Sequence, residues 1–308
     1  MATVYVRFPA PRRVPAAPSP LLERLLARAD SQAHIGDWRR DAFALIAQMP
    51  DPPPAVAPAA LLAALGPQDG RTAFLATPVH CTADMTSVHL DADGILPLDG
   101  AEAAELARDF NRVLGGAEFR LLASPTGKLF CITDRVIAAA AADPQNALAR
   151  DIGGFLPTGS GAPALRALMS EIEMWLFDHP LNRARSAAGR APVTGLWLWG
   201  GGALLTALPP LSGWVAGADA LFDAWPAHQA TVRGAPGAGS GVVVLAAEPG
   251  TPAWAEAQSR SILPALGALN AGRIARLELS SGERCFRIGR WGQWRLWRRT
   301  RPWWEYFA

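Results

Sequence analysis

The feature that most constrains the fold of this chain is a short apolar run, Leu196-Trp197-Leu198-Trp199, followed at once by three glycines. The run is too short for a surface helix, and it fits a strand that is covered on both faces, as in a parallel sheet. Three glycines after such a strand allow a sharp turn or the close approach of a ligand to the backbone. Ligands of open α/β sheets bind beyond the carboxyl ends of strands. Gly200, Gly201 and Gly202 are therefore candidate ligand-binding residues, with a plain tight turn as the alternative.

A helix precedes this strand in the chain. Apolar residues at Leu165, Leu168 and Ile172 recur at helical spacing, so they share one face. Pro180 ends the helix, because a proline disfavours helical backbone angles at the residue before it. The segment 181–190 is predicted to be a polar connection between the helix and the strand.

Three polar residues at the end of that helix form a candidate site for an anion: His179, Asn182 and Arg185. The guanidinium of Arg185 can hold an anionic group with two parallel hydrogen bonds, and His179 can transfer a proton. On this interpretation Arg185→Ala lowers the affinity for phosphate-bearing ligands without unfolding the protein. The alternative is structural: His179 and Asn182 bond to loop carbonyls, and Arg185 covers a helix end. His80, which follows a predicted strand, is a further candidate, with a packed or surface histidine as its alternative.

Composition sets wider limits. The 308 residues suffice for one large or two modest domains, and 50% hydrophobic with 18% charged residues is typical of globular proteins. The 29 basic and 27 acidic residues indicate no particular partner. Cys81, Cys131 and Cys285 are odd in number and not at metal-ligand spacing. We therefore expect reduced thiols, a cytoplasmic location and no metal site or cofactor.

No secretory signal is expected, because prolines and arginines interrupt the N-terminal apolar residues. The segment 191–218 has no charged residue, but glycines and prolines break it. It is therefore predicted to be buried core and not a membrane span.

The organisation of the chain is predicted to be α/β, in three parts. A helical part comes first, opened by a short edge strand at residues 3–8. A small α+β subdomain follows, in which Asp99 and Glu102 form a capping box at the start of its one helix. The third part is a sheet region with a helical connection at 135–150, a strand at 241–246 and a hairpin at 274–288. The predicted boundaries are 1–70, 71–134 and 135–308.

The C-terminal tail of the chain is basic and aromatic, with arginines and tryptophans interleaved over residues 290–304. Such a pattern can follow a phosphate backbone and stack on bases, lie at a membrane surface, or pack into the fold with cation–π contacts. Salt-sensitive retention on DNA that is lost on deleting residues 290–308 would support nucleic-acid binding.

The pattern His179-Pro180-x-Asn182-x-x-Arg185-x-x-x-Gly189, with a proline and an apolar strand ending in Trp-Gly after it, resembles a segment of the archaeal-type cofactor-independent phosphoglycerate mutases. These enzymes belong to the alkaline-phosphatase-like superfamily. Most of the chain also resembles the RpfE-type regulatory proteins of bacteria, which are themselves similar to phosphoglycerate mutases. That likeness includes Pro78-Val79-His80, the helix start at 96–103, WLWGGG, GRIARLEL at 272–279 and LWRRTRP at 296–302.

The resemblance implies a reduced alkaline-phosphatase-like sheet and, in the enzymes, two divalent metals held by Asp and His beside a Ser or Thr nucleophile. This chain departs from that pattern. No Asp-Gly follows the strand at 3–8, Thr194 stands where the enzymes favour Asn, and Thr77 stands where the regulatory proteins favour Asp. Two-metal phosphoryl transfer needs several converging carboxylates.

The first functional hypothesis is therefore a phosphoglycerate-mutase-like protein that has lost its metal centre and acts as a cytosolic regulatory or binding protein for a small phosphorylated ligand. An active metal-dependent mutase or phosphatase is the second hypothesis. A nucleic-acid or protein interaction module that uses the Trp/Arg tail is the third.

Overall fold

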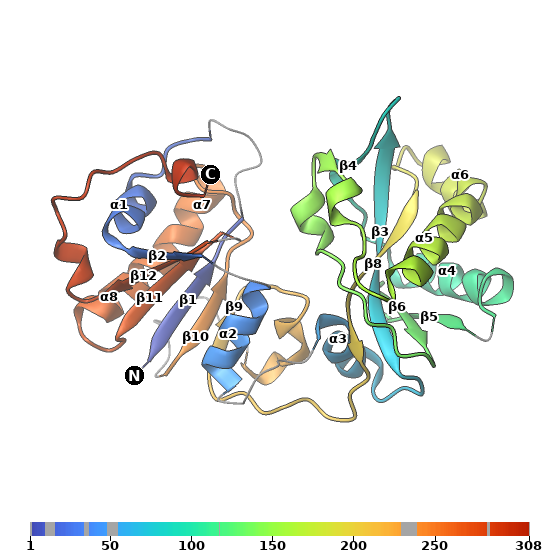
Figure 1. The fold of residues 1–308 in the computed structure, drawn as a ribbon, viewed down its shortest axis with the longest axis horizontal. Helices are drawn as coiled ribbons and strands as arrows, with labels where there is room; N and C mark the ends of the chain where they lie inside the picture. The colour runs from blue at the N-terminus through green and yellow to red at the C-terminus, as the bar shows by residue number, and fades with distance from the viewer. Residues whose placement is uncertain are drawn as a thin grey trace. The chain divides into compact units, whose positions relative to one another are not determined.

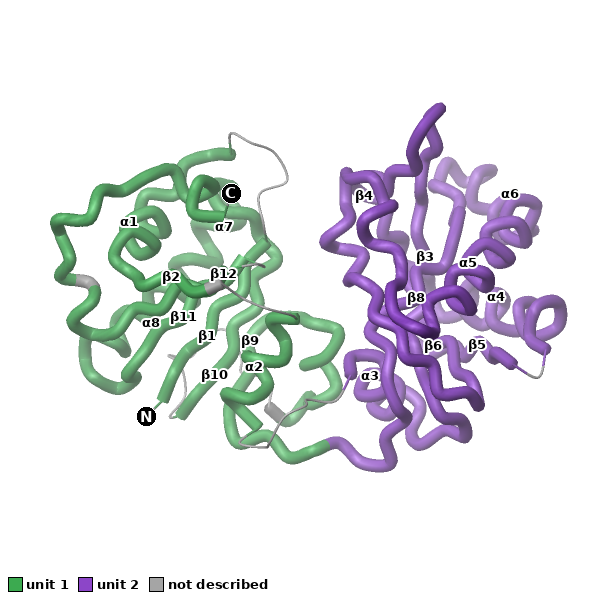
Figure 2. The backbone as a smooth tube through the Cα atoms, viewed as in Figure 1, with its two compact units in different colours: residues 1–53, 209–308 green, residues 54–208 purple. Residues whose placement is uncertain are grey.

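The structure, a computed structural model, divides the chain into two compact units. One consists of residues 1–53 and 209–308 and is called unit 1; the other consists of residues 54–208 and is called unit 2 (Figure 2). The residues described are 2–9, 16–33, 37–47, 55–116, 118–228, 239–281 and 284–307. Each unit has a six-stranded sheet with helices, so the predicted α/β class is confirmed.

The sheet of unit 1 joins the two ends of the chain. Its strand order is β2-β12-β11-β1-β10-β9, so β1 is a central strand and the predicted edge position was wrong (Figure 1). β1 pairs in parallel with β10 and β11, and β9 pairs in parallel with β10, whereas β12 is antiparallel to β11 and β2. The strands are β1 (Thr3–Arg7), β2 (Asp30–Ala33), β9 (Trp214–Ala216), β10 (Gly241–Val244), β11 (Arg276–Ser280) and β12 (Arg284–Gly289).

The two faces of this sheet are covered by different helices. Val4 and Val6 of β1 lie in a core with apolar residues of α1 (Pro20–Arg28), α8 (Leu263–Asn270) and the C-terminal segment. Tyr5 points to the other face, where its ring stacks on Trp38 of α2 (Trp38–Ala47) at 6.3 Å. This alternation is the normal two-residue period of a strand. A helix was predicted at 252–271; α7 (Pro252–Ala257), one π-helical turn (Gln258–Ile262) and α8 run through that range.

Unit 2 is built around one long strand, β3. Its sheet has the order β5-β6-β3-β4-β7, and β8 pairs with β3 as well. β3 is antiparallel to its partners β4, β6 and β8. The strands are β3 (Thr72–Ala83), β4 (Val88–Ile95), β5 (Phe119–Ala123), β6 (Leu129–Thr133), β7 (Arg150–Asp151) and β8 (Gly195–Ala203).

Helices cover both faces of the unit 2 sheet. The core on one face combines β3, β6 and β8 with α4 (Gly100–Val113), α5 (Ala162–Phe177) and the start of α6 (Pro180–Ala187). On the other face α3 (Val56–Leu65) packs against β8 and β3 (Figure 1). All four residues of the Leu196–Trp199 run are buried, as the sequence predicted.

Two predictions about the central segment were wrong. The strand β8 runs antiparallel to β3, not in a parallel sheet. The glycines do not form a turn: Gly200, Gly201 and Gly202 lie inside β8. The pairing of β8 with β3 shifts between Leu75↔Trp199 and Ala73↔Gly202, which is a β-bulge, and Gly200 has φ +64° there. A glycine adopts this angle without the steric cost that a Cβ atom brings.

Two connections also differ from the prediction. The polar segment after Pro180 is the helix α6, because Pro180 occupies its first turn and His179 caps it. The segment 135–150 was predicted to be helical, but its one helical element is the 3₁₀ turn at Pro144–Ala147.

The compact units do not follow the three predicted parts. The N-terminal strand pairs with C-terminal strands, so residues 1–53 belong with residues 209–308. The predicted subdomain 71–134 contributes four strands, β3 to β6, of the six-stranded sheet that β7 and β8 complete. None of the described helices is both long and apolar enough to cross a membrane.

Candidate functional site

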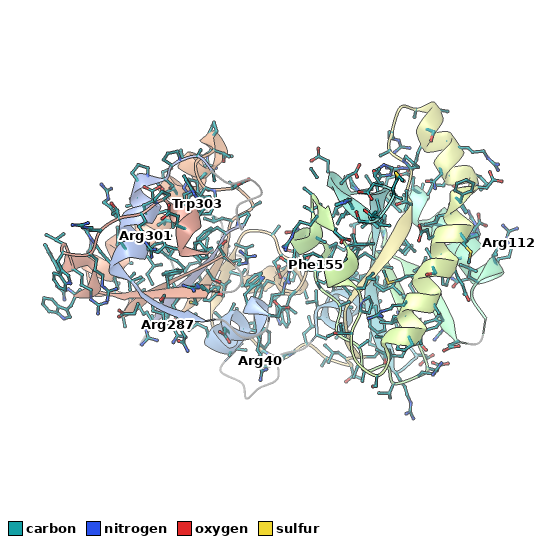
Figure 3. All side chains as sticks on the ribbon, turned by 45° about the horizontal axis from the view of Figure 1, so that its top comes forward. Arg40, Arg112, Phe155, Arg287, Arg301 and Trp303 are labelled. Carbon is teal, nitrogen blue, oxygen red and sulfur yellow. The ribbon has the colours of Figure 1, made fainter. Side chains whose placement is uncertain are left out.

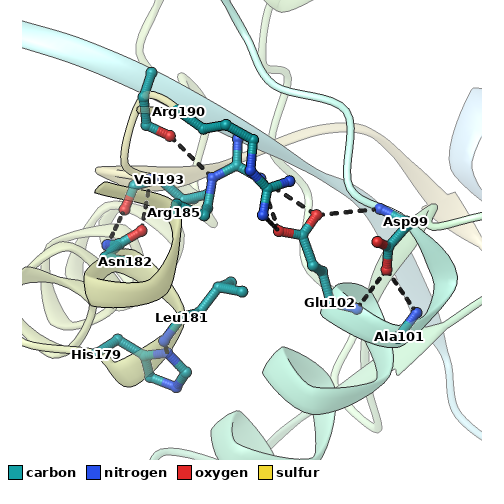
Figure 4. Close-up of polar contacts among 10 residues, drawn as sticks. Asp99, Ala101, Glu102, His179, Leu181, Asn182, Arg185, Arg190 and Val193 are labelled. Carbon is teal, nitrogen blue, oxygen red and sulfur yellow. Dashed lines mark hydrogen bonds and ion pairs between the residues drawn. The ribbon is translucent and has the colours of Figure 1, made fainter. Parts of the chain in front are cut away.

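Glu102 is the centre of the polar cluster that contains the predicted anion-binding residues (Figure 4). It is the third residue of α4, and the predicted capping box is present: the Asp99 side chain accepts from the backbone of Glu102 at 2.8 Å, and Glu102 accepts from the backbone of Asp99 at 3.3 Å. The same carboxylate also contacts two arginines. Arg185 Nη1 lies 3.1 Å and Arg190 Nη2 lies 2.8 Å from Glu102 Oε1.

The two arginines differ in burial. The side chain of Arg185 is 4% exposed and that of Arg190 is 48% exposed. Two guanidinium groups share one carboxylate, so these three side chains carry one net positive charge. Arg185 is fixed, because its Nε also donates to the carbonyl of Ala191 at 2.9 Å. Arg190 is the member of the cluster that solvent and ligands can reach.

Asn182 is buried and holds the chain segment that follows Arg190. Its Nδ2 donates to the carbonyls of Val193 and Leu176, both at 2.8 Å. Its Oδ1 accepts from the backbone N–H of Val193 at 2.8 Å. The structural alternative for Asn182 is therefore observed, and Arg185 plays a similar part through Ala191.

Segment 190–194 is held from its other side by β3. The ring Nδ1 of His80 lies 2.8 Å from the carbonyl oxygen of Pro192. The backbone N–H of Cys81 donates to Thr194 Oγ1 at 2.8 Å, and the backbone N–H of Thr194 donates to the carbonyl of Val79 at 2.8 Å. Asn182 and Arg185 of α6, together with His80 of β3, thus fix this segment between α6 and β3.

A hollow with a volume of about 550 Å³ lies beside this fixed segment. Ala149, one of its lining residues, has φ +58° and is the one non-glycine residue with a positive φ among those described. An alanine in this region costs about 1 kcal/mol, and such backbone strain is often found at functional sites. The hollow is lined by His80, His89, Leu90, Asp91, Ala92, Asp93, Ala149 and Ala191.

His80 and Asp91 face each other in this hollow. A carbonyl oxygen only accepts hydrogen bonds, so the contact with Pro192 places the proton of neutral His80 on Nδ1. Nε2 lies 3.7 Å from Asp91 Oδ2. Asp91 also accepts from the Thr82 hydroxyl at 2.8 Å. The Asp91 carboxylate can accept hydrogen bonds from the hydroxyl groups of a small ligand.

His179, by contrast, is a helix cap and does not line the hollow. Its Nδ1 accepts from the backbone N–H of Leu181 at 3.2 Å, and its ring packs edge-on to Trp175 at 4.7 Å. Its Nε2 lies 3.5 Å from Asp109. Burial lowers the pKa of His179, and the nearby carboxylate of Asp109 offsets only part of that shift.

The three glycines of β8 are also accounted for by packing. A Cβ atom on Gly201 would meet the ring of Phe74 at 2.1 Å, and one on Gly202 would meet Ala55 at 2.4 Å. On Gly200 it would lie 2.9 Å from Val56. The glycines therefore let α3 and Phe74 pack closely on β8, and the space beside them is filled by apolar side chains.

The resemblance implies a metal-binding aspartate after the first strand, at the carboxyl edge of the unit 1 sheet. Other residues lie at this edge. β1 leads into Phe8, which is fully buried and packs edge-on to Trp254 at 5.6 Å and Phe307 at 5.7 Å. Asp219, which follows β9, is buried in a bidentate pair with Arg39: Nε donates to Oδ1 at 3.1 Å and Nη2 lies 2.8 Å from Oδ2. Aromatic packing and an ion pair thus occupy this edge.

Among the described residues there is no group of three or more His, Cys, Asp and Glu side chains that could hold a metal ion. Cys81, Cys131 and Cys285 are free thiols. Burial raises the pKa of Cys81 to about 11 and that of Cys131 to about 12. A raised pKa disfavours the thiolate that a cysteine nucleophile requires.

Sequence comparison connects one third of the chain to phosphoglycerate mutases. The chain is 29% identical over 101 residues to the 2,3-bisphosphoglycerate-independent phosphoglycerate mutase of Methanothrix thermoacetophila, covering 33% of this chain and 25% of that protein. It is 30% identical over 103 residues to a protein of Geobacter sulfurreducens described as a probable mutase of the same type, covering 33% and 26%. The chain thus matches about a quarter of the length of these curated relatives. No family model matches the chain.

Solved structures give a weaker likeness. The cofactor-independent phosphoglycerate mutase of Thermoplasma acidophilum has a TM-score of 0.39 and 14% identity, over 94% of this chain and 90% of that one. A protein of Pyrococcus horikoshii has a TM-score of 0.43 and 11% identity, over 94% and 87%. The similarity to phosphoglycerate mutases therefore depends on the matched sequence segments. The closer RpfE-type relation stays a prediction.

Sequence reasoning found His80 as a candidate but missed the acidic residues Asp91 and Asp93 that share its hollow. It also missed that Glu102, Arg185 and Arg190 meet. The capping-box pattern gave Glu102 a local role, but no pattern along the chain links it to an arginine 83 residues away.

Proposed function

We propose that this chain is a binding protein related to the phosphoglycerate mutases, with an alkaline-phosphatase-like ancestry, that takes a small phosphorylated hydroxy acid in the hollow beside segment 190–194. The observation that carries the proposal is the construction of that hollow. His179, Asn182 and Arg185 do not line it, yet Asn182 and Arg185 hold the segment whose Ala191 forms part of its wall.

The hollow itself is acidic, since Asp91 and Asp93 line it, and the Asp91 carboxylate can accept hydrogen bonds from the hydroxyl groups of a ligand. The anionic end of the ligand is therefore assigned to Arg190, which directly precedes the lining residue Ala191, is half exposed and shares the Glu102 carboxylate with Arg185. An anionic group can therefore compete with Glu102 for the Arg190 guanidinium.

We further propose that the chain acts as a regulatory protein in the cytosol and does not catalyse metal-dependent phosphoryl transfer. The support for the second part is the packing of the unit 1 sheet edge, where Phe8 lies in an aromatic cluster and Asp219 is bound to Arg39. Two-metal phosphoryl transfer requires free carboxylates that converge on the ions.

Calorimetry with 3-phosphoglycerate and with glycerate tests the ligand. The wild-type protein should bind 3-phosphoglycerate more tightly, and Arg190→Gln should reduce that affinity by about tenfold, because one charge-assisted bond is lost. Arg183→Gln is the matched control, since Arg183 is an exposed arginine of the neighbouring helix that pairs with Asp178. Equal affinity of Arg190→Gln and wild type would remove the hollow as the ligand site.

An assay of 3-phosphoglycerate conversion in the presence of Mg²⁺ or Mn²⁺ tests the proposal that the protein is not a metal-dependent catalyst. We expect no conversion to 2-phosphoglycerate. Measurable conversion by the purified protein would favour the alternative, an active metal-dependent mutase, whether or not Arg190→Gln weakens binding.

A further inference from the structure

The basic and aromatic tail divides into two parts with opposite environments. Trp303, labelled in Figure 3, belongs to unit 1. It is fully buried, its Nε1 donates to the carbonyl of Ala17 at 2.9 Å, and Tyr306 is 7% exposed. These residues belong to the core of unit 1. The preceding residues 290–299, here called the tryptophan loop, are on the surface. Deleting residues 290–308 would therefore remove core residues, so it cannot test the surface by itself.

The tryptophan loop exposes an unusual amount of apolar surface. Trp291 is 79% exposed, Trp294 64%, Leu296 66% and Trp297 76%. Single exposed apolar residues are normal on a protein surface, but clusters of large ones mark binding surfaces. Here four large apolar side chains protrude from seven consecutive positions.

The loop is nevertheless held in place. Arg298 donates to the carbonyl of Ala29 at 2.6 Å and to Asp30 at 3.2 Å. Arg295 also bonds to Asp30, and this hydrogen bond lowers the pKa of the Asp30 carboxyl. The tryptophans are therefore presented by an anchored loop, so little conformational entropy is lost when they bind.

The charges around the loop are positive. Arg295 and Arg298 bond to Asp30. Arg273, Arg290 and Arg299 are exposed, and the Arg290 guanidinium lies over the Trp291 ring at 5.8 Å. Arg273 and Arg290 lie at the same corner, since a Cβ atom on Gly272 would be 3.7 Å from an Arg290 nitrogen. Exposed tryptophans with an arginine rim are complementary to the headgroup region of an anionic bilayer, where indole rings and basic side chains both gain free energy.

We propose that the tryptophan loop docks on the surface of an anionic lipid bilayer. The side chains protrude from a surface segment that contains one 3₁₀ turn, Gly292–Trp294, whereas bases stack in grooves lined by aromatic rings. Leu296 adds to burial in lipid but offers no ring on which a base could stack. The protein would lie at the membrane surface through this loop, with no spanning helix involved.

Co-sedimentation of the full chain with vesicles tests the proposal. Wild-type protein should bind phosphatidylcholine vesicles that contain phosphatidylserine and bind pure phosphatidylcholine vesicles more weakly. W291S/W294S/W297S should lower binding to the anionic vesicles by roughly tenfold or more, because the buried apolar area is lost. M174S/F177S is the matched control: it removes two apolar residues of α5 that are 71% and 91% exposed, outside the tryptophan loop, and should leave binding unchanged.

Quenching of wild-type tryptophan fluorescence by brominated lipid gives a second measurement that needs no variant. Quenching with anionic vesicles supports the proposal. No sedimentation and no quenching would overturn it, as would equal binding of the triple variant. Binding to single-stranded RNA that the triple variant loses, together with indifference to vesicles, would overturn the lipid assignment in favour of nucleic acid.

Discussion

Glu102 and Arg185 show how a residue that looks like a ligand contact can serve the fold. Arg185 is buried and bonds to Glu102 and to the carbonyl of Ala191. A buried charge is tolerated when it is paired and hydrogen-bonded. Removing one member of the pair destabilises the protein, because the other charge is then left buried without a partner.

We therefore expect Arg185→Ala to destabilise the protein by about 3 kcal/mol, since it leaves Glu102 with one arginine and the Ala191 carbonyl without its donor. The expectation drawn from the sequence was that Arg185→Ala lowers the affinity for phosphate-bearing ligands without unfolding the protein. Urea unfolding measures the change, with Arg183→Gln as an exposed arginine control. A variant as stable as wild type would show that the cluster contributes little to the fold.

His179 predicts a dependence of stability on pH. Burial lowers its pKa in the folded protein, so the unfolded chain binds a proton at higher pH than the folded chain does. The stabilisation is then complete above the ordinary histidine pKa of about 6.5 and is lost as the pH falls toward the lower folded value.

The variant His179→Asn keeps a side chain that caps α6 but removes the titration. Its free energy of unfolding should fall less than that of wild type between about pH 7 and about pH 5. Denaturant unfolding at several pH values measures this difference. Parallel curves for the two proteins would assign the acid sensitivity to other groups.

At the scale of elements, the contact of α3 and β8 depends on the absence of side chains. The bulge at Gly200 and the missing Cβ atoms of Gly201 and Gly202 bring the strand close to Phe74, Ala55 and Val56. Overpacking of a buried contact forces side chains out of their preferred rotamers.

Gly201→Ala should therefore destabilise the protein by about 2 kcal/mol, because the added methyl group would overlap the buried ring of Phe74. Gly195→Ala in the same strand is the control, since its methyl group would meet Val79 at an ordinary 3.7 Å. Thermal unfolding of both variants gives the comparison. If the two variants melt alike, the packing explanation of the glycines is wrong.

At the scale of the whole molecule, the order of segments along the chain differs from their grouping into compact units. Unit 2 is one continuous segment with its own sheet and its own core, inserted between two segments that share a second sheet. Such a segment meets the requirement for independent folding, which is a hydrophobic core of its own.

Residues 54–208 expressed alone should therefore unfold in a single cooperative transition and show a dispersed NMR spectrum. Residues 71–134, the subdomain predicted from the sequence, should not, because they lack β8 and α5. A broad, non-cooperative transition of the 54–208 fragment would mean that unit 2 depends on the remainder of the chain.

The sequence by itself determined the local features of this protein. The spacing of apolar residues gave α5, the capping box gave the start of α4, and the apolar run gave the buried strand β8, because these follow from neighbours within a few residues. Only the tertiary structure decided that β1 is central, that β8 is antiparallel and that Arg185 binds Glu102. The ion pair and the strand pairings join residues that are 83 or more positions apart in the chain, and β8 could have paired in either direction. The periodicity of apolar residues within one segment specifies neither the distant partner nor the direction of pairing.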